Sequence, residues 1–91
     1  MIKIDEENLE QYIEIFNAKN IEIKVTGLFK QNTKVKLAEF DYNPKNGKIK
    51  IRNNSVYLKI DLSFVYRIEI NEELNRLAFY FDDEMKVTIA K

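Results

Sequence analysis

The chain has 91 residues, enough for one domain with a single hydrophobic core. Its 15 basic residues balance 15 acidic ones, so no net field draws nucleic acid or anionic lipid to the whole molecule. Cysteine and histidine are both absent, which excludes disulfides, thiol nucleophiles, imidazole bases and soft metal ligands. No apolar run approaches the roughly 20 residues that span a bilayer, and no secretory signal opens the chain. We therefore expect one cytoplasmic domain, residues 1–91, that does not contact membranes.

An amphipathic helix is predicted over about Glu6 to Lys19. Its apolar stripe has the spacing i, i+3, i+4 and i+7 and consists of Leu9, Tyr12, Ile13 and Phe16. Asp5 is the expected N-cap, through its carboxylate, and Ile4 is expected to pack on Leu9. The stripe must lie on a sheet or plug the end of a barrel.

After Asn20 the apolar period changes from 3.6 residues to two, which predicts strands. The first strand runs from Ile21 to Val25, and Gly27 then interrupts it as a bulge or bend would. The next covers about Thr33 to Tyr42. Within it the apolar positions change from odd numbers to even numbers, and a slip of one residue predicts a bulge or a barrel corner.

Turns divide the rest of the chain into short strands. Asn46 and Gly47 suit a type I′ reversal, and a further turn is predicted at Asn53 to Ser55. From Val56 to Ile70 every even-numbered residue is apolar, and we expect this long stretch to break near Asp61 to Ser63.

A hairpin is predicted to close the chain, with its turn at Asp82 to Glu84. The facing apolar residues on its two strands are Leu77, Phe79, Phe81, Met85, Val87 and Ile89. The predicted fold class is mainly β within the α+β type. An N-terminal helix precedes a strongly bent antiparallel sheet or small barrel of about seven strands.

Few residues of this sequence could catalyse a reaction or bind a metal ion or phosphate. Asp82, Asp83 and Glu84 could bind a hard cation, but they lack the spaced pattern of a calcium loop and are better explained as a solvated turn. Neither glycine lies in a phosphate-cradling motif. We therefore expect no enzyme activity, no cofactor, no metal and no small-molecule substrate.

Basic residues are concentrated between Lys30 and Arg52, where only Glu39 and Asp41 oppose them. If the flanking strands pair, alternation places these cations on one outward face, with Tyr42 and Tyr57 near enough to stack on unpaired bases. The predicted nucleic-acid-binding residues are Lys34, Lys36, Tyr42, Lys48, Lys50, Arg52 and Asn54. The alternative is a soluble strand face whose lysines discourage edge-to-edge aggregation.

The segment Ile51-Arg52-Asn53-Asn54-Ser55-Val56 resembles the hydrophobic-Arg-Gly-polar-polar-hydrophobic part of the second signature of Sm-like small β-barrels, which include the YolD-like proteins of Gram-positive bacteria. Asn53 stands where that signature has glycine. The likeness extends at pattern level from about Asn8 to Ile70. It implies a bent sheet under an N-terminal helix, often assembled into RNA-binding rings, with Arg52 and Asn54 in the loop that contacts nucleotides.

The closing hairpin gives a second hypothesis. Residues 77–81 are apolar on both strand faces, so one face needs a cover, either the helix or another protein chain. The predicted protein-binding residues are Phe79, Tyr80, Phe81 and Met85. On this hypothesis the protein is a non-catalytic adaptor or inhibitor that binds a protein or itself, such as a small phage or mobile-element protein. The alternative function is Sm-like binding of RNA or single-stranded nucleic acid.

Overall fold

A computed structural model describes residues 2–27, 30–73, 75–82 and 84–91. Within them the chain forms one α-helix, eight strands and a short 3-10 helix. The elements in chain order are β1 (Ile2–Ile4), α1 (Glu6–Phe16), β2 (Lys19–Thr26), β3 (Gln31–Asn43), β4 (Lys48–Arg52), β5 (Tyr57–Asp61), η1 (Leu62–Phe64), β6 (Val65–Asn71), β7 (Arg76–Phe81) and β8 (Lys86–Ala90).

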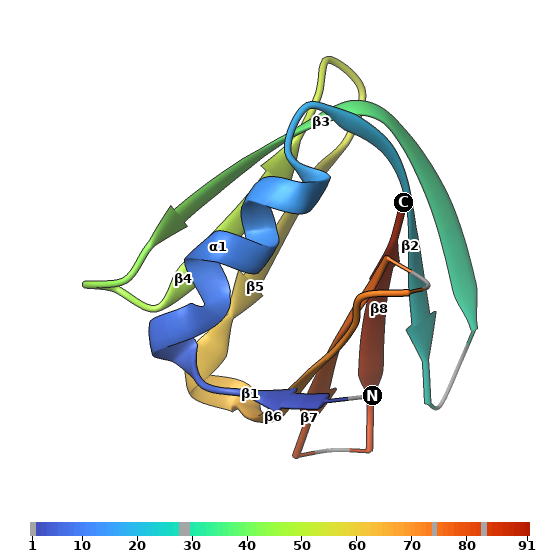
Figure 1. Cartoon of the computed structure of the whole chain (residues 1–91). Coiled ribbons are helices and arrows are strands. Elements are labelled where there is room, and N and C mark those ends of the chain that lie inside the picture. The colour runs from blue at the N-terminus through green and yellow to red at the C-terminus, as the bar shows by residue number, and fades with distance from the viewer. Residues whose placement is uncertain (1, 28–29, 74, 83) are drawn as a thin grey trace.

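All strands belong to one antiparallel sheet with the order β1-β6-β7-β8-β2-β3-β4-β5. The sheet bends around α1, so that β4 and β5 lie on one side of the helix and β2 and β8 on the other, with the long β3 crossing between them (Figure 1). The predicted fold class is confirmed. Of the two predicted forms the bent sheet is the one observed, because β1 and β5 form two separate ends of the strand order, and β1 adds a strand to those predicted.

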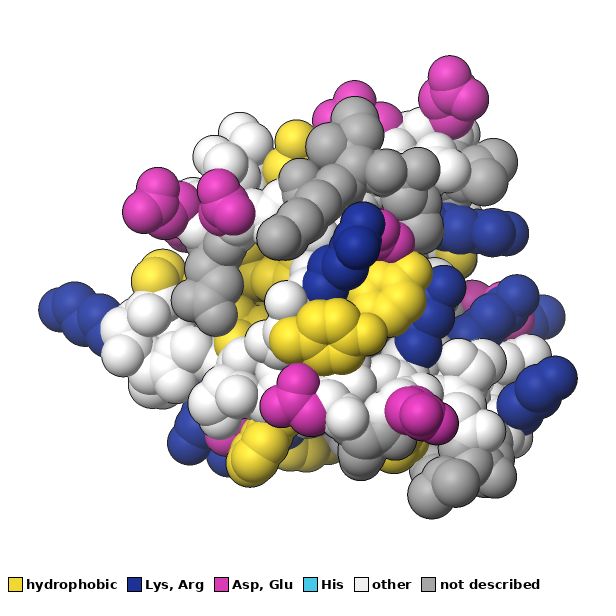
Figure 2. Space-filling model, turned by 90° about the horizontal axis from the view of Figure 1, so that it is seen from below, with side chains coloured by type: hydrophobic (Ala, Val, Ile, Leu, Met, Phe, Trp, Pro, Cys, Tyr) yellow, Lys and Arg dark blue, Asp and Glu magenta, His cyan; other side chains and the backbone are white. Residues whose placement is uncertain are grey.

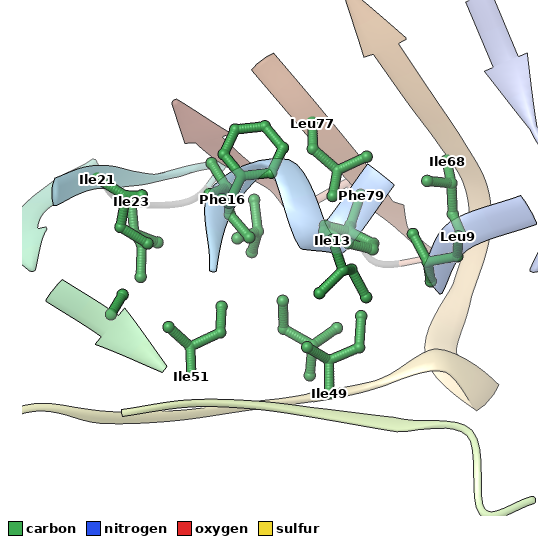
Figure 3. Packing of buried hydrophobic residues seen from close by; sticks show 14 of the residues in the cluster. Leu9, Ile13, Phe16, Ile21, Ile23, Ile49, Ile51, Ile68, Leu77 and Phe79 are labelled. Atoms are coloured by element: carbon green, nitrogen blue, oxygen red, sulfur yellow. The ribbon is translucent and has the colours of Figure 1, made fainter. Parts of the chain in front are cut away.

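The core fills the concave side of the sheet. Apolar residues lie in register across neighbouring strands, as in the row Val25, Val87, Phe79, Ile68 and Ile4. The helix closes this core: Figure 3 shows its side chains between the isoleucines of β4 and the apolar side chains of β7. Leu9 and Phe16 are fully buried, which confirms the predicted apolar stripe.

The helix is shorter than predicted and ends at Phe16. Asn17 has left the helical region, with φ −66° and ψ 136°, and Ala18 adopts a left-handed φ of 59°. This change of direction is fixed from β3, because the Ala18 amide donates to the Ala38 carbonyl at 2.7 Å. Asp5 is the N-cap by position, but its side chain makes no capping hydrogen bond, so that detail of the prediction was wrong.

The predicted break in the long alternating stretch is confirmed by η1. The Asp61 carboxylate accepts hydrogen bonds from the Ser63 amide and hydroxyl at 3.0 and 2.7 Å, which turns the chain between β5 and β6. The predicted closing hairpin also forms, with Leu77 opposite Ile89 and Phe79 opposite Val87. Asp83, in its predicted turn, lies outside the described residues.

The turn between β3 and β4 is not of type I′. That type requires positive φ at two successive residues, but only Gly47 has it, at 65°. The chain instead forms a wider loop over residues 44–47, in which the Asn43 carbonyl accepts from the Asn46 and Gly47 amides. The side chains of Asn43 and Asn46 accept further hydrogen bonds from backbone amides. These bonds give the amides of the loop partners without a second left-handed residue.

No helix within the described part of the chain is long and apolar enough to cross a membrane.

Candidate binding surfaces

The bulge predicted in β3 occurs at Lys36 and Leu37. The register between β2 and β3 shifts between Lys19 and Ile21, and Leu37 takes a left-handed φ of 50°. Asn20 holds the bulge open by accepting the Leu37 amide at 3.0 Å, and the Asn53 side chain donates to the Lys36 carbonyl at 3.1 Å. The bulge therefore ties the turn between β4 and β5 to the middle of β3.

An open groove of about 720 Å³ lies beside this bulge, and we call it the bulge groove. Its lining residues come from β3 and from the turn between β4 and β5: Lys34, Lys36, Leu37, Glu39, Arg52, Asn53, Asn54, Ser55 and Val56. Four of the predicted nucleic-acid-binding residues, Lys34, Lys36, Arg52 and Asn54, therefore surround one groove.

Positive charge dominates the bulge groove. Arg52 pairs with Glu39 across 3.7 Å, and both side chains are more than half exposed, so this pair is weak. No ion pair among the described residues involves Lys34 or Lys36, and both are exposed. Glu22 lies opposite Lys34 in register, but it pairs with Lys24, so within the described residues the charges of the two groove lysines are not held in an ion pair.

A second groove of about 550 Å³ shares Lys34 and Lys36 with the first. Its other lining residues lie on β2 and β3 and at the ends of β7 and β8: Asn20, Ile21, Glu22, Val35, Arg76, Ala90 and Lys91. The two grooves meet at the lysines. A basic track therefore runs from Arg52 past the bulge towards Arg76 and Lys91.

Other members of the predicted basic face lie elsewhere. Lys48 and Lys50 are on the outer face of β4, but their neighbours in register include Asp61 and Asp41, which dilute the positive charge. Tyr42 is half-buried against the core, because it lies opposite the fully buried Ile49. Tyr42 does not line the bulge groove.

Leu37 and Tyr57 supply the exposed apolar surface near the groove. Simple alternation from Val35 would turn Leu37 inward, but the bulge turns it outward and leaves it 67% exposed. Tyr57 lies opposite Arg52 on the neighbouring strand and is 61% exposed. Of the two predicted stacking residues, Tyr57 is the one near the groove.

A second group of polar and aromatic side chains lies on the outer face of β6, β7 and β8, and we call it the tyrosine cluster. Its members are Tyr66, Arg67, Glu69, Tyr80 and Lys86. The Tyr80 hydroxyl donates to the Glu69 carboxylate at 2.7 Å, and Arg67 pairs with the other carboxylate oxygen at 2.6 Å. Lys86 lies 5.0 Å from the centre of the Tyr80 ring, and Tyr66 packs beside that ring. Figure 2 views the molecule from below and shows hydrophobic side chains among basic and acidic ones.

Two carboxyl groups have shifted pKa values. The Tyr80 hydrogen bond, followed by the charge of Arg67 and its hydrogen bond, lowers the pKa of Glu69 despite the burial that opposes this shift. Hydrogen bonds from Ser63 lower the pKa of Asp61. Both shifts come from local structural contacts, and Glu69 is therefore held charged by the cluster that buries it.

The predicted protein-binding residues are divided between core and surface. Phe79 is fully buried, so the structure removes it from any exposed surface. Tyr80, Phe81 and Met85 are half-buried.

The exposed aromatic residues nearby are Phe64 and Tyr66, each 62% exposed, which sequence alternation assigned to the inner face. η1 and a register shift between Val65 and Arg67 reverse that alternation. In the sequence, the only signal for this reversal was the break predicted near Asp61 to Ser63, just before Phe64.

Comparison of the chain with protein-family models, curated proteins and solved structures found no match. The resemblance to Sm-like barrels therefore stays a prediction. Within the described residues, no group of three or more acidic, histidine or cysteine side chains could hold a metal ion.

Proposed function

We propose that this protein is a non-catalytic binding module whose bulge groove binds single-stranded nucleic acid. The observation that supports this proposal is the meeting of Lys34, Lys36 and Arg52 around one open groove beside exposed polar turn residues. Lysine and arginine neutralise phosphates and release counterions, which supplies most of the affinity for a nucleic-acid backbone.

The remaining groove residues suit unpaired bases. Asn54 and Ser55 are exposed in the turn between β4 and β5 and can hydrogen-bond to base edges. Leu37 in the groove offers apolar surface, and Tyr57, opposite Arg52 just outside the groove lining, has an exposed ring that can stack on any base. Bases in a duplex would be stacked on one another and unable to use these surfaces, so the proposal specifies a single strand.

Fluorescence anisotropy with labelled single-stranded RNA and DNA 12-mers tests this proposal. Three phosphate contacts on a single strand give a slope of about −2 for log affinity against log salt, so affinity should fall roughly 20-fold between 50 and 200 mM salt. The double variant Lys34→Glu, Lys36→Glu should bind more than tenfold more weakly and show a shallower slope.

The matched control is Lys45→Glu, Lys59→Glu, which makes the same change in net charge at two exposed lysines outside the groove. It should keep most of the affinity. Absence of binding to any 12-mer at 50 mM salt, or equal losses in the two double variants, would overturn the proposal.

A second candidate function is protein binding at Phe64 and Tyr66. Aromatic residues and arginine are enriched at the energetic centres of protein interfaces, and both rings are exposed, with Tyr66 next to Arg67 in β6. Capture from a lysate of the native host tests it. A specific protein partner should be retained by the native protein and by Lys34→Glu, Lys36→Glu, and lost from Phe64→Ser, Tyr66→Ser; retention by all three would exclude this surface.

A further inference from the structure

The helix α1 presents an acidic face on the surface opposite its buried stripe. Leu9, Ile13 and Phe16 point into the core, so the other side of the helix faces solvent. A shallow depression there is lined by Glu7, Asn8, Glu10, Gln11 and Glu14. The last turn of the helix contains no basic residue.

The carboxylates of Glu7, Glu10 and Glu14 take part in no ion pair among the residues that the structure describes. Among the same residues, none involves Lys34 or Lys36. The net charge of zero thus conceals two surfaces of opposite sign. Surfaces of opposite charge attract each other and set the orientation of an encounter.

The two surfaces also have similar dimensions. Glu7, Glu10 and Glu14 follow one side of the helix over about 10 Å, given a rise of about 1.5 Å per residue. Lys34 and Lys36 are about 7 Å apart along β3, and Arg52 lies on the next strand opposite Glu39, three residues beyond Lys36, so the three cations cover roughly 15 Å. Three carboxylates and three cations can therefore approach each other in one contact.

The contact cannot form within one molecule. The helix lies on the concave side of the sheet (Figure 1). The groove residues Lys34, Lys36 and Glu39 are exposed and alternate with core residues of β3, so they lie on the other side of the sheet. The sheet itself separates them. A helix that reaches the groove must belong to another copy.

We propose that the acidic face of α1 of one copy binds the bulge groove of a second copy. This inference rests on the anion-binding groove of the proposed function and adds an occupant that competes with nucleic acid for it. Because the two contacting surfaces differ, the contact is of the head-to-tail type. Its exposed charges make it weak and sensitive to salt.

A charge-swap experiment by analytical ultracentrifugation tests the proposal. The native protein should associate with rising concentration at 50 mM salt and sediment as a monomer at 500 mM salt. Glu10→Lys, Glu14→Lys and Lys34→Glu, Lys36→Glu should each associate at least tenfold more weakly alone. Mixed in equal amounts they should associate again, because each variant's helix then matches the other's groove.

Monomeric native protein at 50 mM salt, or a mixture that stays monomeric, would overturn the inference. The helix variant also separates it from the proposed function, because its groove is intact and should bind the 12-mers at least as tightly as the native protein does. Oligonucleotide binding without association of the mixture rejects only the contact between copies. If circular dichroism shows the lysine variant unfolded, Glu7→Gln, Glu10→Gln, Glu14→Gln takes its place, with weaker self-association expected.

Discussion

The bulge groove and the tyrosine cluster both carry charged residues on the outer face of the same sheet, but their charges are used in opposite ways. In the tyrosine cluster, Glu69 is 9% exposed and has partners in Tyr80 and Arg67. In the bulge groove, Lys34 and Lys36 are exposed and have no ion-pair partner among the described residues. Charges that neutralise each other support the fold, and charges that do not are available to a ligand.

The largest loss of stability is expected for a mutation in the core directly beneath the tyrosine cluster. Phe79→Ala should destabilise the protein by about 4 kcal/mol, because it removes a fully buried ring from the core. Urea denaturation measures this loss. The control is Tyr66→Ala, in the cluster above but 62% exposed, which should change stability by less than about 0.5 kcal/mol. Equal effects would show that Phe79 does not belong to the core.

Charge reversal should separate the two regions. Arg67→Glu should cost about 2 kcal/mol, because it places a second negative charge against the nearly buried Glu69. Lys36→Glu should stay within about 0.5 kcal/mol of the native protein. Chemical denaturation of both variants in the same buffer compares them, and a larger loss for Lys36→Glu would reverse the roles assigned to the two regions.

Removal of one hydroxyl should make stability depend differently on pH. Tyr80→Phe should cost about 1.5 kcal/mol at pH 7, because it deletes a hydrogen bond to a charged group. The pKa of Glu69 lies below its ordinary 4.5 in the folded protein, so the unfolded state binds more protons in that range. The stabilisation is therefore complete above about pH 4.5 and is lost as pH falls through the lowered pKa.

Denaturation of the native protein and Tyr80→Phe between pH 7 and pH 3 checks the sign. The difference in stability between them should shrink on acidification. A difference that stays constant or grows would show that the Tyr80 hydroxyl does not stabilise the charged form of Glu69.

The smallest expected effect is a gain of stability in the bulge groove. Leu37 has φ 50° and is 67% exposed, so Leu37→Gly relieves left-handed strain and loses little buried surface. The melting temperature should rise by an amount equivalent to about 1 kcal/mol. Val35→Gly, in the same strand but buried, is the control and should be strongly destabilising. A lower melting temperature for Leu37→Gly would contradict the bulge geometry.

Sequence periodicity predicted the fold well because side-chain alternation is a local property. The helix stripe, the strand phases and the break near Asp61 all follow from nearest-neighbour patterns. Predictions failed where a hydrogen bond from a distant residue changes the phase. Asn17 and Asn20 accept amides of β3 about 20 residues away, which ends the helix early and turns Leu37 outward. The local phase slip predicted the bulge, but it did not show that Leu37 turns outward or that the helix ends at Phe16.

For the candidate site, the sequence likewise predicted the local features but not how distant residues come together. The excess of positive charge between Lys30 and Arg52 indicated a basic surface, and the turn predicted at Asn53 to Ser55 included Asn54. The bulge and the Asn53 hydrogen bond to the Lys36 carbonyl determine which basic side chains come together around the groove. The unexpected exposure of Phe64 and Tyr66 has a separate cause, η1 and the register shift between Val65 and Arg67.

Titration of the ¹⁵N-labelled protein with an unlabelled single-stranded 12-mer, followed by amide chemical shifts, tests the contrast between the two regions most directly. We predict that the shifts concentrate at residues 34–37 and 52–55, that they diminish between 50 and 200 mM salt, and that Arg67 and Lys86 stay unchanged. Shifts centred on the tyrosine cluster, or none at saturating oligonucleotide, would contradict the account.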